Sequence, residues 1–230
     1  MVDRPEARSV QLCPARSIRL NSINQGGRSA TGAARTSWVR IVSFDSRQYY
    51  CKTYVYPTLA WQLRSLTRTA PWQSSRAATE AAALAWLHVR GFPGPRVAGL
   101  VEWRRFGLLA KALLVTEAWP GKALDALLPT LPPDSRQQLA RALGRFVAAL
   151  HRLGFRDRNL DLRNLLAAAT GDGGFAIAKI DSGRHRLVRP GPPRDRLARA
   201  DWARLLPQLR PFGLDAVALA AGSQGVETAT

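Results

Sequence analysis

The sequence predicts an α+β fold, with β-hairpins in its N-terminal half and long helices in its C-terminal half. Two segments rich in β-branched and aromatic residues, 37–44 and 48–55, flank a short turn and so favour a hairpin. Apolar residues recur with helical spacing over 135–153. The chain has 230 residues and is 46% hydrophobic, which is enough to bury a core. We therefore expect one domain divided into two lobes.

The N-terminal lobe is predicted to follow a flexible arm. Residues 1–36 are polar and rich in Gly, Ser and Arg, a composition typical of mobile segments. The first hairpin then turns at Asp45, Ser46 and Arg47, whose residue types favour turns over strands. The ordered fold is therefore expected to start at 37.

A helix and a second strand pair should complete this lobe. The helical pattern covers 74–90, with Ser74 or Ser75 as its cap and Gly91 at its end. Two further runs, predicted to pair as antiparallel strands, cover 96–103 and 108–119.

The longest predicted helix, 135–153, opens the C-terminal lobe. Asp134 is expected to cap it, with Gln137 in the capping-box position, and Gly154 is expected to end it. Its buried stripe should consist of Leu139, Leu143, Phe146, Leu150 and Leu153.

Shorter elements follow this helix. Strands are predicted over 165–169 and 175–180, on either side of a Gly-rich turn, and a further helix around 196–209. The small residues of the C-terminal tail, 211–230, are expected to be frayed.

The composition is strongly basic. There are 34 Lys and Arg residues against 16 Asp and Glu, a formal net charge of +18, and 30 of the 34 are Arg. Such a charge attracts phosphate-rich partners, namely nucleic acid, anionic lipid head groups or a phosphorylated glycolipid. A generally basic solvated surface in an Arg-biased sequence accounts for the same count.

The sequence also bears on location and redox state. It has no apolar run of 18 residues, and its first twenty residues lack the apolar centre of a signal peptide, so we expect a cytoplasmic protein. The two cysteines, Cys13 and Cys51, are too few for a disulfide framework and lack metal-site spacing. We interpret both as free thiols.

A first candidate site combines Lys52 and Glu80. Glu80 shares a helical face with Leu84 and Leu87, which places a carboxylate on the stripe that should face the core. A buried carboxylate needs a cation, and Lys52 on the preceding strand is the candidate. The alternative is a helix rotated so that Glu80 is in water.

A second candidate site combines Asn164 and Asp181. Asn164 precedes one strand of a predicted hairpin, and Asp181 follows the other, so their side chains should lie at adjoining strand ends. Their hard oxygen atoms suit Mg²⁺ that holds a triphosphate. Asn and Asp are equally common in turns for purely local reasons.

The order of these parts is that of a protein-kinase-like fold: strand Lys, helix Glu, a strand before a hinge, a helix, an Asn-bearing loop and Asp-x-Gly. From about 37 to 210 the chain resembles the lipopolysaccharide kinase (Kdo/WaaP-like) family. The matching segments are YYCKTY, SSRAATEAAALAWLHVRGFPGPR, LLVTEAWPG, LHRLGF, DRNLDLRNLL, IDSGR and DRLARADWARLL.

This resemblance implies a compact protein-kinase-like fold, with a sheet-plus-helix N-lobe of about 37–118 and a reduced, mainly helical C-lobe of about 119–210. It also implies phosphorylation of sugar hydroxyls of the lipopolysaccharide inner core, with ATP and Mg²⁺ as cofactors. The expected partner is an anionic glycolipid or sugar acceptor, reached by peripheral association with the inner membrane.

The resemblance further assigns roles to matching residues. Lys52 would contact the α- and β-phosphates, and Glu80 would orient Lys52. Asn164 and Asp181 would hold Mg²⁺. The backbone of Glu117 to Trp119 would receive the adenine.

Several positions depart from the pattern. No G-x-G-x-x-G motif occurs, and Gly26, Gly27 and Gly32 form only a loose glycine-rich stretch. Ser182 replaces the Phe of the metal motif. Only 49 residues follow Asp181, without an Ala-Pro-Glu segment, which favours a small-molecule or glycolipid acceptor over a protein.

The catalytic loop has the most consequential departure. Counting back five residues from Asn164 reaches Asn159, where the pattern has the catalytic Asp, and Asp157 replaces the loop His. An amide can hydrogen-bond a hydroxyl but cannot take its proton at neutral pH. Asp161, two residues further on, is the candidate replacement base, or else a solvent-facing loop carboxylate.

Two functions from different classes follow. The leading one is an ATP-dependent glycolipid kinase, and the alternative is a pseudokinase that binds nucleotide without turnover. Nucleic-acid binding ranks third, because no helix-turn-helix, zinc-finger or RNP-like pattern accompanies the positive charge.

Overall fold

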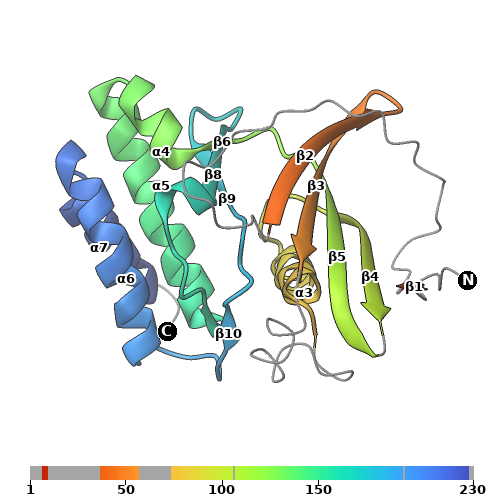
Figure 1. Ribbon diagram of the computed structural model, residues 1–230. Coiled ribbons are helices and arrows are strands. Elements are labelled where there is room, and N and C mark those ends of the chain that lie inside the picture. The colour runs from red at the N-terminus through yellow and green to blue at the C-terminus, as the bar shows by residue number, and fades with distance from the viewer. Residues whose placement is uncertain (1–6, 10–36, 57–73, 106, 194, 228–230) are drawn as a thin grey trace, which may run out of the picture. The chain divides into compact units, whose positions relative to one another are not determined.

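The computed structural model divides the chain into two compact units (Figure 1). The first unit consists of residues 1–86 and 95–119, and the second of 87–94 and 120–230. The structure describes residues 7–9, 37–56, 74–105, 107–193 and 195–227. The fold is mixed α and β, with an antiparallel sheet in the N-terminal part and helices in the C-terminal part, as predicted.

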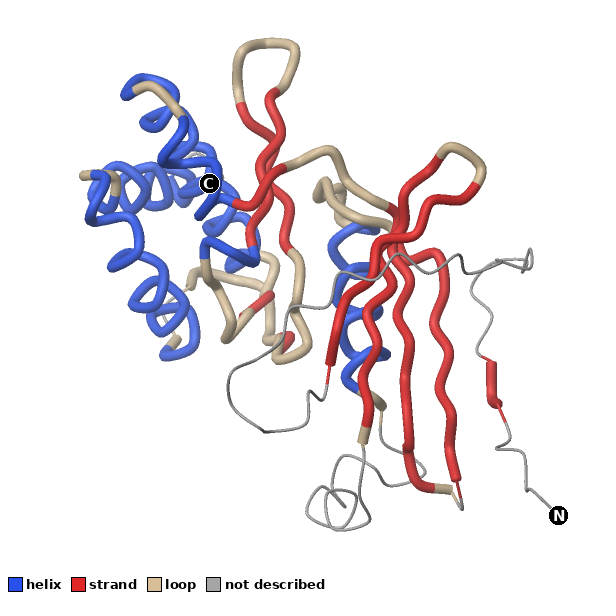
Figure 2. Tube along the Cα trace, turned by 45° about the horizontal axis from the view of Figure 1, so that its top comes forward, coloured by secondary structure: helices blue, strands red, loops and turns tan. Residues whose placement is uncertain are grey.

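The first unit is built on a five-stranded antiparallel sheet in the order β1-β4-β5-β3-β2 (Figure 2). Its strands are β1 (Ala7–Ser9), β2 (Ser37–Phe44), β3 (Arg47–Val55), β4 (Val97–Arg105) and β5 (Leu108–Glu117). The predicted hairpins β2–β3 and β4–β5 are therefore confirmed. Cys51 on β3 is a buried free thiol, and burial raises its pKa.

The first hairpin turns more tightly than expected. Only Asp45 and Ser46 form the turn, with φ of 52° and 61°, and Arg47 already belongs to β3. Positive φ at both central residues is the pattern of a type I′ turn, which matches the natural twist of two antiparallel strands. This twist explains why two residues suffice.

The N-terminal arm is not wholly irregular. Ala7–Ser9 form β1, which pairs with β4 in the register Ala7↔Trp103, so the expectation of an arm without ordered structure is wrong for these three residues. A three-residue strand has no sequence period to detect, and only the free edge of β4 creates it. The rest of 1–36, including Cys13, lies outside the described residues.

Helix α3 (Arg76–Val89) begins and ends where predicted. The Ser75 hydroxyl accepts a hydrogen bond from Ala78 N at 2.9 Å, and Gly91 follows the helix with φ of 79°. Two alanines of the helix share a buried cluster with residues of β3 and β5. The core consists of Tyr54, Ala77, Ala81, Leu109, Ala112 and Leu114.

The second unit is centred on α5 (Pro133–Arg152). Asp134 does not cap this helix: Pro133 is its first residue, Pro132 occupies the cap position without a side-chain hydrogen bond, and Asp134 lies in the first turn. Proline suits the first helical position because its missing N–H would have no partner there.

The buried stripe of α5 is confirmed except at one position. Leu139, Leu143, Phe146 and Leu150 are buried, whereas Leu153 is 39% exposed. Leu153 is the C-cap residue, so it has left the helical geometry, and Gly154 follows it with φ of 85°.

The remaining elements of this unit are short, apart from two helices. They are β6 (Lys122–Ala123), α4 (Leu124–Leu127), β7 (Phe155–Arg156), β8 (Leu165–Ala169), β9 (Phe175–Lys179), β10 (Arg186–Leu187), α6 (Arg196–Leu209) and α7 (Asp215–Glu227). The predicted β8–β9 pair and α6 are confirmed. Among the described helices, none has the length and apolarity to cross a bilayer.

The expectation of a frayed tail after 211 is wrong. Residues 215–227 form α7, which packs against α5. Its Ala and Gly residues carry a weak amphipathic signal, but they allow the helices to approach very closely. A Cβ atom added at Gly144 of α5 would lie 2.1 Å from the carbonyl oxygen of Ala218 on α7.

This contact yields a stability prediction. Gly144→Ala should lower the free energy of unfolding by about 1–3 kcal/mol, because a backbone oxygen cannot move aside as a side chain would. The matched control is Gly171→Ala, where an added Cβ meets no atom within 4 Å. Urea unfolding of the two variants checks the prediction, and equal stabilities would contradict the α5–α7 packing.

Candidate active site

Lys52 and Glu80 form the ion pair expected from the sequence. Lys52 Nζ lies 2.9 Å and 3.2 Å from the two carboxylate oxygens of Glu80, and Tyr54 donates a third hydrogen bond to Glu80 at 2.5 Å. The Glu80 side chain is 6% exposed and that of Lys52 is 20% exposed. The buried carboxylate therefore holds the lysine in one orientation while the lysine stays accessible.

The predicted hinge, Glu117 to Trp119, lies at the end of β5. Glu117 N donates to Arg96 O and Ala118 N donates to Gln48 O, both at 2.8 Å. Among the described residues, Trp119 N–H has no such partner. Of the three hinge amides, it is therefore the donor left for a ligand.

In the second unit, Asn159, Asn164 and Asp181 lie together. Asn159 Nδ2 donates to Asp181 at 3.3 Å (backbone O) and 3.4 Å (Oδ2), and Asn164 Nδ2 donates to Asn159 O at 3.2 Å. Asn164 is buried, whereas Asn159 and Asp181 are half-buried. The amide at the position of the catalytic Asp thus contacts the predicted metal ligand directly.

Asp161 makes local contacts. Its Oδ1 accepts a hydrogen bond from Arg163 N at 3.3 Å and caps the short 3-10 turn Leu162–Asn164. Arg163 Nε lies 3.6 Å from the same oxygen. The side chain is 19% exposed, so a carboxylate oxygen remains accessible from solvent.

Two residues of this site have a backbone that side chains normally avoid. Arg158 has φ of 59° and Asp181 has φ of 55°. A non-glycine residue in this region is strained, and the surrounding structure must hold it there. Strain of this kind clusters at functional sites, which makes this loop a candidate site.

The residue that holds the loop is Asp201 on α6, which the sequence analysis missed. Its carboxylate accepts hydrogen bonds from Asp157 N at 3.0 Å and Arg158 N at 2.9 Å. His151 Nε2 lies 3.1 Å from the same group, and both side chains are 2% exposed. The one available signal was an Asp on the otherwise apolar face of the predicted helix 196–209, where a carboxylate needs partners.

A second anchor joins Arg156 and Asp195. Arg156 Nη2 donates to Asp195 Oδ2 at 2.6 Å and Nε donates to the same oxygen at 2.9 Å. The Arg156 side chain is 1% exposed. Its hydrogen bonds hold the pKa of Asp195 well below the usual range, although partial burial opposes this shift. Asp195 also caps α6, by accepting from Leu197 N and Ala198 N.

A buried ion pair lies beneath the loop. Lys179 Nζ is 3.2 Å from Asp157 Oδ2, and the two side chains are 0% and 1% exposed. Burial raises the pKa of Asp157, against the lowering effect of Lys179 and of the Ser182 hydroxyl. Among the described residues, neither Ser182 Oγ nor the Asp157 carboxylate makes a hydrogen bond of good geometry.

The donor set suits Mg²⁺ that arrives with a nucleotide. Mg²⁺ takes oxygen ligands and keeps phosphate oxygens and waters in its shell, so one carboxylate and one amide oxygen suffice. Asn164 uses its Nδ2 on Asn159 O and keeps Oδ1, and Asp181 supplies the carboxylate. Within the described ranges no three His, Cys, Asp or Glu residues cluster, so a site made of protein ligands alone is absent there.

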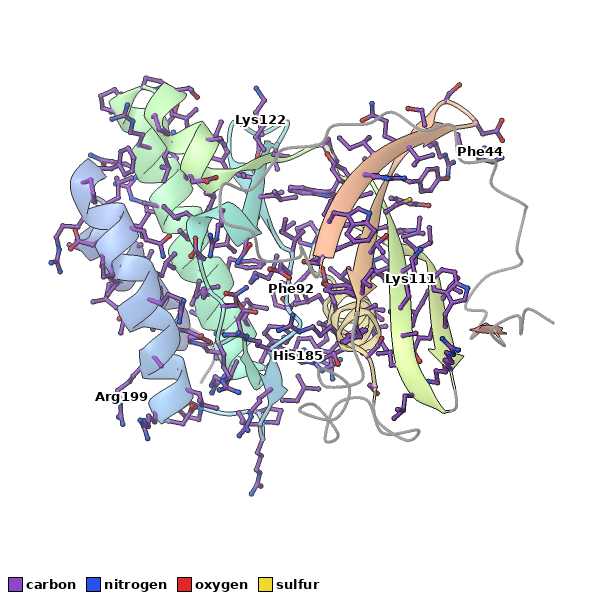
Figure 3. The ribbon with its side chains drawn as sticks, in the orientation of Figure 1. Phe44, Phe92, Lys111, Lys122, His185 and Arg199 are labelled. Atoms are coloured by element: carbon purple, nitrogen blue, oxygen red, sulfur yellow. The ribbon has the colours of Figure 1, made fainter. Side chains whose placement is uncertain are left out.

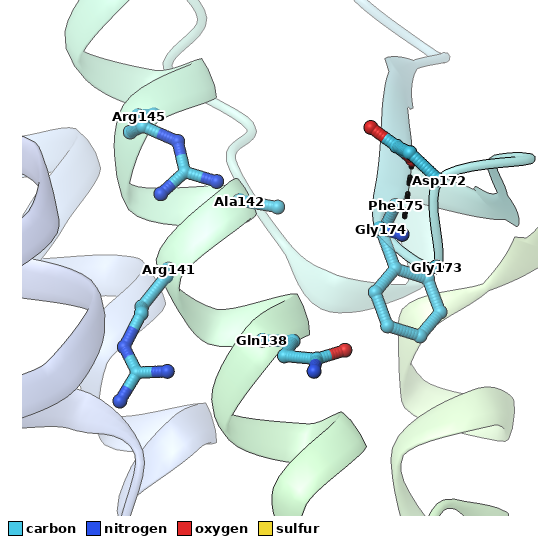
Figure 4. A pocket seen from close by; sticks show the side chains of 8 residues that line it. All are labelled: Gln138, Arg141, Ala142, Arg145, Asp172, Gly173, Gly174 and Phe175. Atoms are coloured by element: carbon cyan, nitrogen blue, oxygen red, sulfur yellow. Dashed lines mark hydrogen bonds between the residues drawn. The ribbon is translucent and has the colours of Figure 1, made fainter.

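A separate groove of 230 Å³ lies between α5 and the β8–β9 turn (Figure 4). Its walls include Arg141 and Arg145 on one side and Phe175 on the other. The carboxylate of Asp172 is occupied by Thr170 Oγ1 and Gly174 N. No predicted site residue lines this groove.

The antiparallel sheet with its Lys–Glu pair, and the Asn and Asp loop of the second unit, define a protein of the kinase-like class. The model of the Lipopolysaccharide kinase (Kdo/WaaP) family matches residues 25–215. The chain therefore belongs to this family of phosphotransferases with a hydroxyl acceptor, and the resemblance drawn from the sequence is confirmed.

Three solved structures similar to this chain are kinases or kinase-like proteins by their names. WaaP in complex with acyl carrier protein is 19% identical over 84% of this chain and 77% of that chain, with a TM-score of 0.59. Monomeric WbdD is 18% identical over 78% of this chain and 45% of that chain, with a TM-score of 0.48. The Rio2 kinase complex with ADP/Mg²⁺ and phosphoaspartate from Chaetomium thermophilum is 15% identical over 86% and 70%, with a TM-score of 0.48.

Of these three structures, only WaaP has a TM-score above 0.5, and at 19% identity the likeness to it shows the fold alone. Among curated proteins, none matches this chain.

The Arg156 anchor gives a pH-dependent prediction. Asp195→Ala should lower the free energy of unfolding at pH 7 by about 1–3 kcal/mol, because Arg156 loses its carboxylate partner and keeps only backbone acceptors, and two helix N–H groups lose their cap. Asp195 has a lowered pKa in the fold, so its contribution is complete above the unfolded Asp pKa of about 3.9 and is lost as the pH falls below it.

Urea unfolding at pH 7 and at pH 3 tests this sign. The difference between the wild type and Asp195→Ala should shrink at the lower pH. Asp134→Ala is the control, since that exposed carboxylate lies in the first turn of α5 and its loss should cost below about 1 kcal/mol. A difference that grows towards pH 3 would contradict the Arg156 contact.

Proposed function

We propose that this chain is an ATP- and Mg²⁺-dependent kinase that transfers phosphate to a sugar hydroxyl of an anionic envelope glycolipid. Its membership of the lipopolysaccharide kinase family supports the class of reaction. The observation that carries the nucleotide assignment is the Lys52–Glu80 pair: a lysine that a buried carboxylate orients and that remains accessible. Such a lysine suits the phosphates of a nucleotide.

Membership of the family supports the nucleotide roles predicted for these residues. Lys52 would contact the α- and β-phosphates, and the Trp119 N–H with the Glu117 carbonyl would receive the adenine. Asn164 and Asp181 would hold Mg²⁺, which neutralises the phosphate oxygens when it is bound. Each unit supplies groups that are already oriented by hydrogen bonds within that unit.

The acceptor hydroxyl would meet Asn159. The Asn159 amide donates to Asp181 through Nδ2, so its Oδ1 is the atom that can accept a hydrogen bond from the hydroxyl. Asn159 would orient the hydroxyl but not deprotonate it. Asp161, whose carboxylate is accessible, or a water molecule would take the proton.

An anionic acceptor fits the surface that follows Asp181. Arg184, Arg186 and Arg189 are exposed on this stretch, and Leu187 is 52% exposed. The stretch is held in place, since Val188 N donates to Gly154 O at 2.8 Å and the His185 ring stacks on the Phe155 ring with a centroid distance of 5.1 Å. Arginines beside an exposed leucine suit phosphorylated head groups at a membrane surface and would support peripheral association.

The alternative is a pseudokinase. The Asn159–Asp181 hydrogen bond favours it, because an amide at the base position already has a structural role beside the metal ligand. General-base help is typically worth ~10²- to 10⁴-fold, so its loss slows phosphoryl transfer while metal and positioning effects remain. Turnover separates the two functions.

The role of Lys52 can be tested by nucleotide binding. Lys52→Met should remove most of the rise in Tm on addition of Mg-ATP, because ligand binding to the folded state alone raises stability. The control is Lys122→Met, a lysine exposed on β6 and labelled in Figure 3. Each shift is measured from the variant's own ligand-free Tm, and equal shifts would refute the role of Lys52.

The identity of the base can be tested at Asn159. We expect Asn159→Asp to raise phosphoryl transfer by ~10²- to 10⁴-fold, the range of general-base catalysis. The new carboxylate would lie beside Asp181 Oδ2, where like charges repel, so the gain should require Mg²⁺. Single-turnover assays with a lipopolysaccharide-core acceptor measure the rate.

Two other outcomes are distinct. If Asp161 is already the base, Asn159→Asp should change little, and Asp161→Asn should remove most of the transfer without changing Mg-ATP affinity. No turnover in any variant, with intact nucleotide binding, would establish the pseudokinase.

A further inference from the structure

Two departures from the kinase pattern meet in the structure. Asp157 stands where the pattern has the loop His, and Ser182 stands where it has Phe. Both side chains are buried, at 1% and 0% exposure, and the Ser182 hydroxyl acts to lower the pKa of the Asp157 carboxyl. Lys179, also buried, supplies the opposite charge at 3.2 Å. The two replacements therefore belong to one polar cluster.

The cluster joins the two segments that carry the site. Asp157 precedes Asn159 by two residues, and Lys179 precedes Asp181 by two residues. The ion pair thus fixes one segment to the other directly below their functional side chains. Asn159 Nδ2 then reaches Asp181 O at 3.3 Å across the same junction.

Lys179 also acts on the peptide that leads into Asp181. Its ammonium donates to the Ile180 carbonyl, and Ile180 N donates to Asn164 O at 2.9 Å. The N–H and the carbonyl of Ile180 are therefore both hydrogen-bonded. This restraint lies next to Asp181, whose φ of 55° needs support from its surroundings.

Stability alone is a poor explanation for such a pair. Desolvating two charges is costly, and apolar residues of similar volume often replace a buried ion pair without loss of stability. Directional hydrogen bonding to one carbonyl is what an apolar pair cannot supply. We propose that Lys179, through Asp157 and the Ile180 carbonyl, is a positioning residue that sets Asp181 against Asn159 for metal binding.

The proposed effect on metal binding rests on the proposed function, whereas the proposed effect of Lys179 on the position of Asp181 does not. The test compares the full chain with Lys179→Met, Asp157→Asn and the double variant Asp157→Leu/Lys179→Met. The single variants leave one buried charge unpaired and should lose stability. The double variant should regain most of the Tm, which separates positioning from folding.

The first readout is hydrogen exchange without nucleotide. In the double variant, the amides of Ile180, Asp157 and Arg158 should exchange at least ~10-fold faster, while those within α5 keep their protection. Unchanged exchange at these three amides would overturn the proposal. Should the double variant fail to fold, exchange in Asp157→Asn, which keeps Lys179, decides the same question.

The second readout is the gain in ATP affinity on adding Mg²⁺, measured by calorimetry with and without a chelator. In the double variant, the factor by which Mg²⁺ increases ATP affinity should be at least ~10-fold smaller. The ATP affinity without Mg²⁺ should stay the same, because Lys52 is unchanged. If Mg²⁺ increases ATP affinity as much in the double variant as in the wild type, the ion pair has only a structural role and the proposal is overturned. If the wild type itself binds no Mg-ATP, the proposed function fails, and hydrogen exchange still decides the positioning role.

Discussion

Asp201 is the group on which the geometry of the second unit depends. Its buried carboxylate contacts His151 from α5 and the backbone N–H groups of Asp157 and Arg158, so one side chain of α6 connects a helix to the loop. A carboxylate that accepts several hydrogen bonds is strongly directional. Arg158 can keep its left-handed backbone because Asp201 holds its N–H on one side.

Both units contain buried charged side chains, each paired with a side chain of opposite charge. Glu80 is matched by Lys52, Asp157 by Lys179, and Arg156 by Asp195. A charge removed from water is tolerated only with a partner, so each pair fixes the relative positions of two elements. In the first unit, the fixed elements are β3 and α3. In the second unit, the Lys179 pair fixes β9 to the Asn159 loop, and the Arg156 pair fixes β7 to the start of α6.

These pairs also bear on the choice between enzyme and pseudokinase. The Asn159 amide and the Asp181 carboxylate are complementary, whereas two carboxylates at the same distance would repel unless a cation lay between them. Asparagine therefore stabilises the metal-free site. The same substitution removes the side chain best suited to accept the hydroxyl proton, so metal-free stability and base catalysis impose opposite requirements on residue 159.

The sequence by itself determined the elements and the chemical types at the site. Strand-forming and turn residues located the strands of the three hairpins, helical periodicity located α3, α5 and α6, and a carboxylate on an apolar stripe identified Glu80 and its partner Lys52. These features are local, or they follow from one strong rule about buried charge. Spacing within one loop singled out Asn159, Asp161 and Asn164 as candidate site residues.

Tertiary structure alone decided the rest. β1 exists because β4 has a free edge, and α7 is ordered because Gly144 admits Ala218, although the tail has little amphipathic pattern of its own. The contacts of Asp201, Asp195 and Lys179 with the loop join residues 22 to 44 positions apart. Sequence periodicity does not predict such pairs, because the packing of α6 and β9 around the loop determines which residues come into contact.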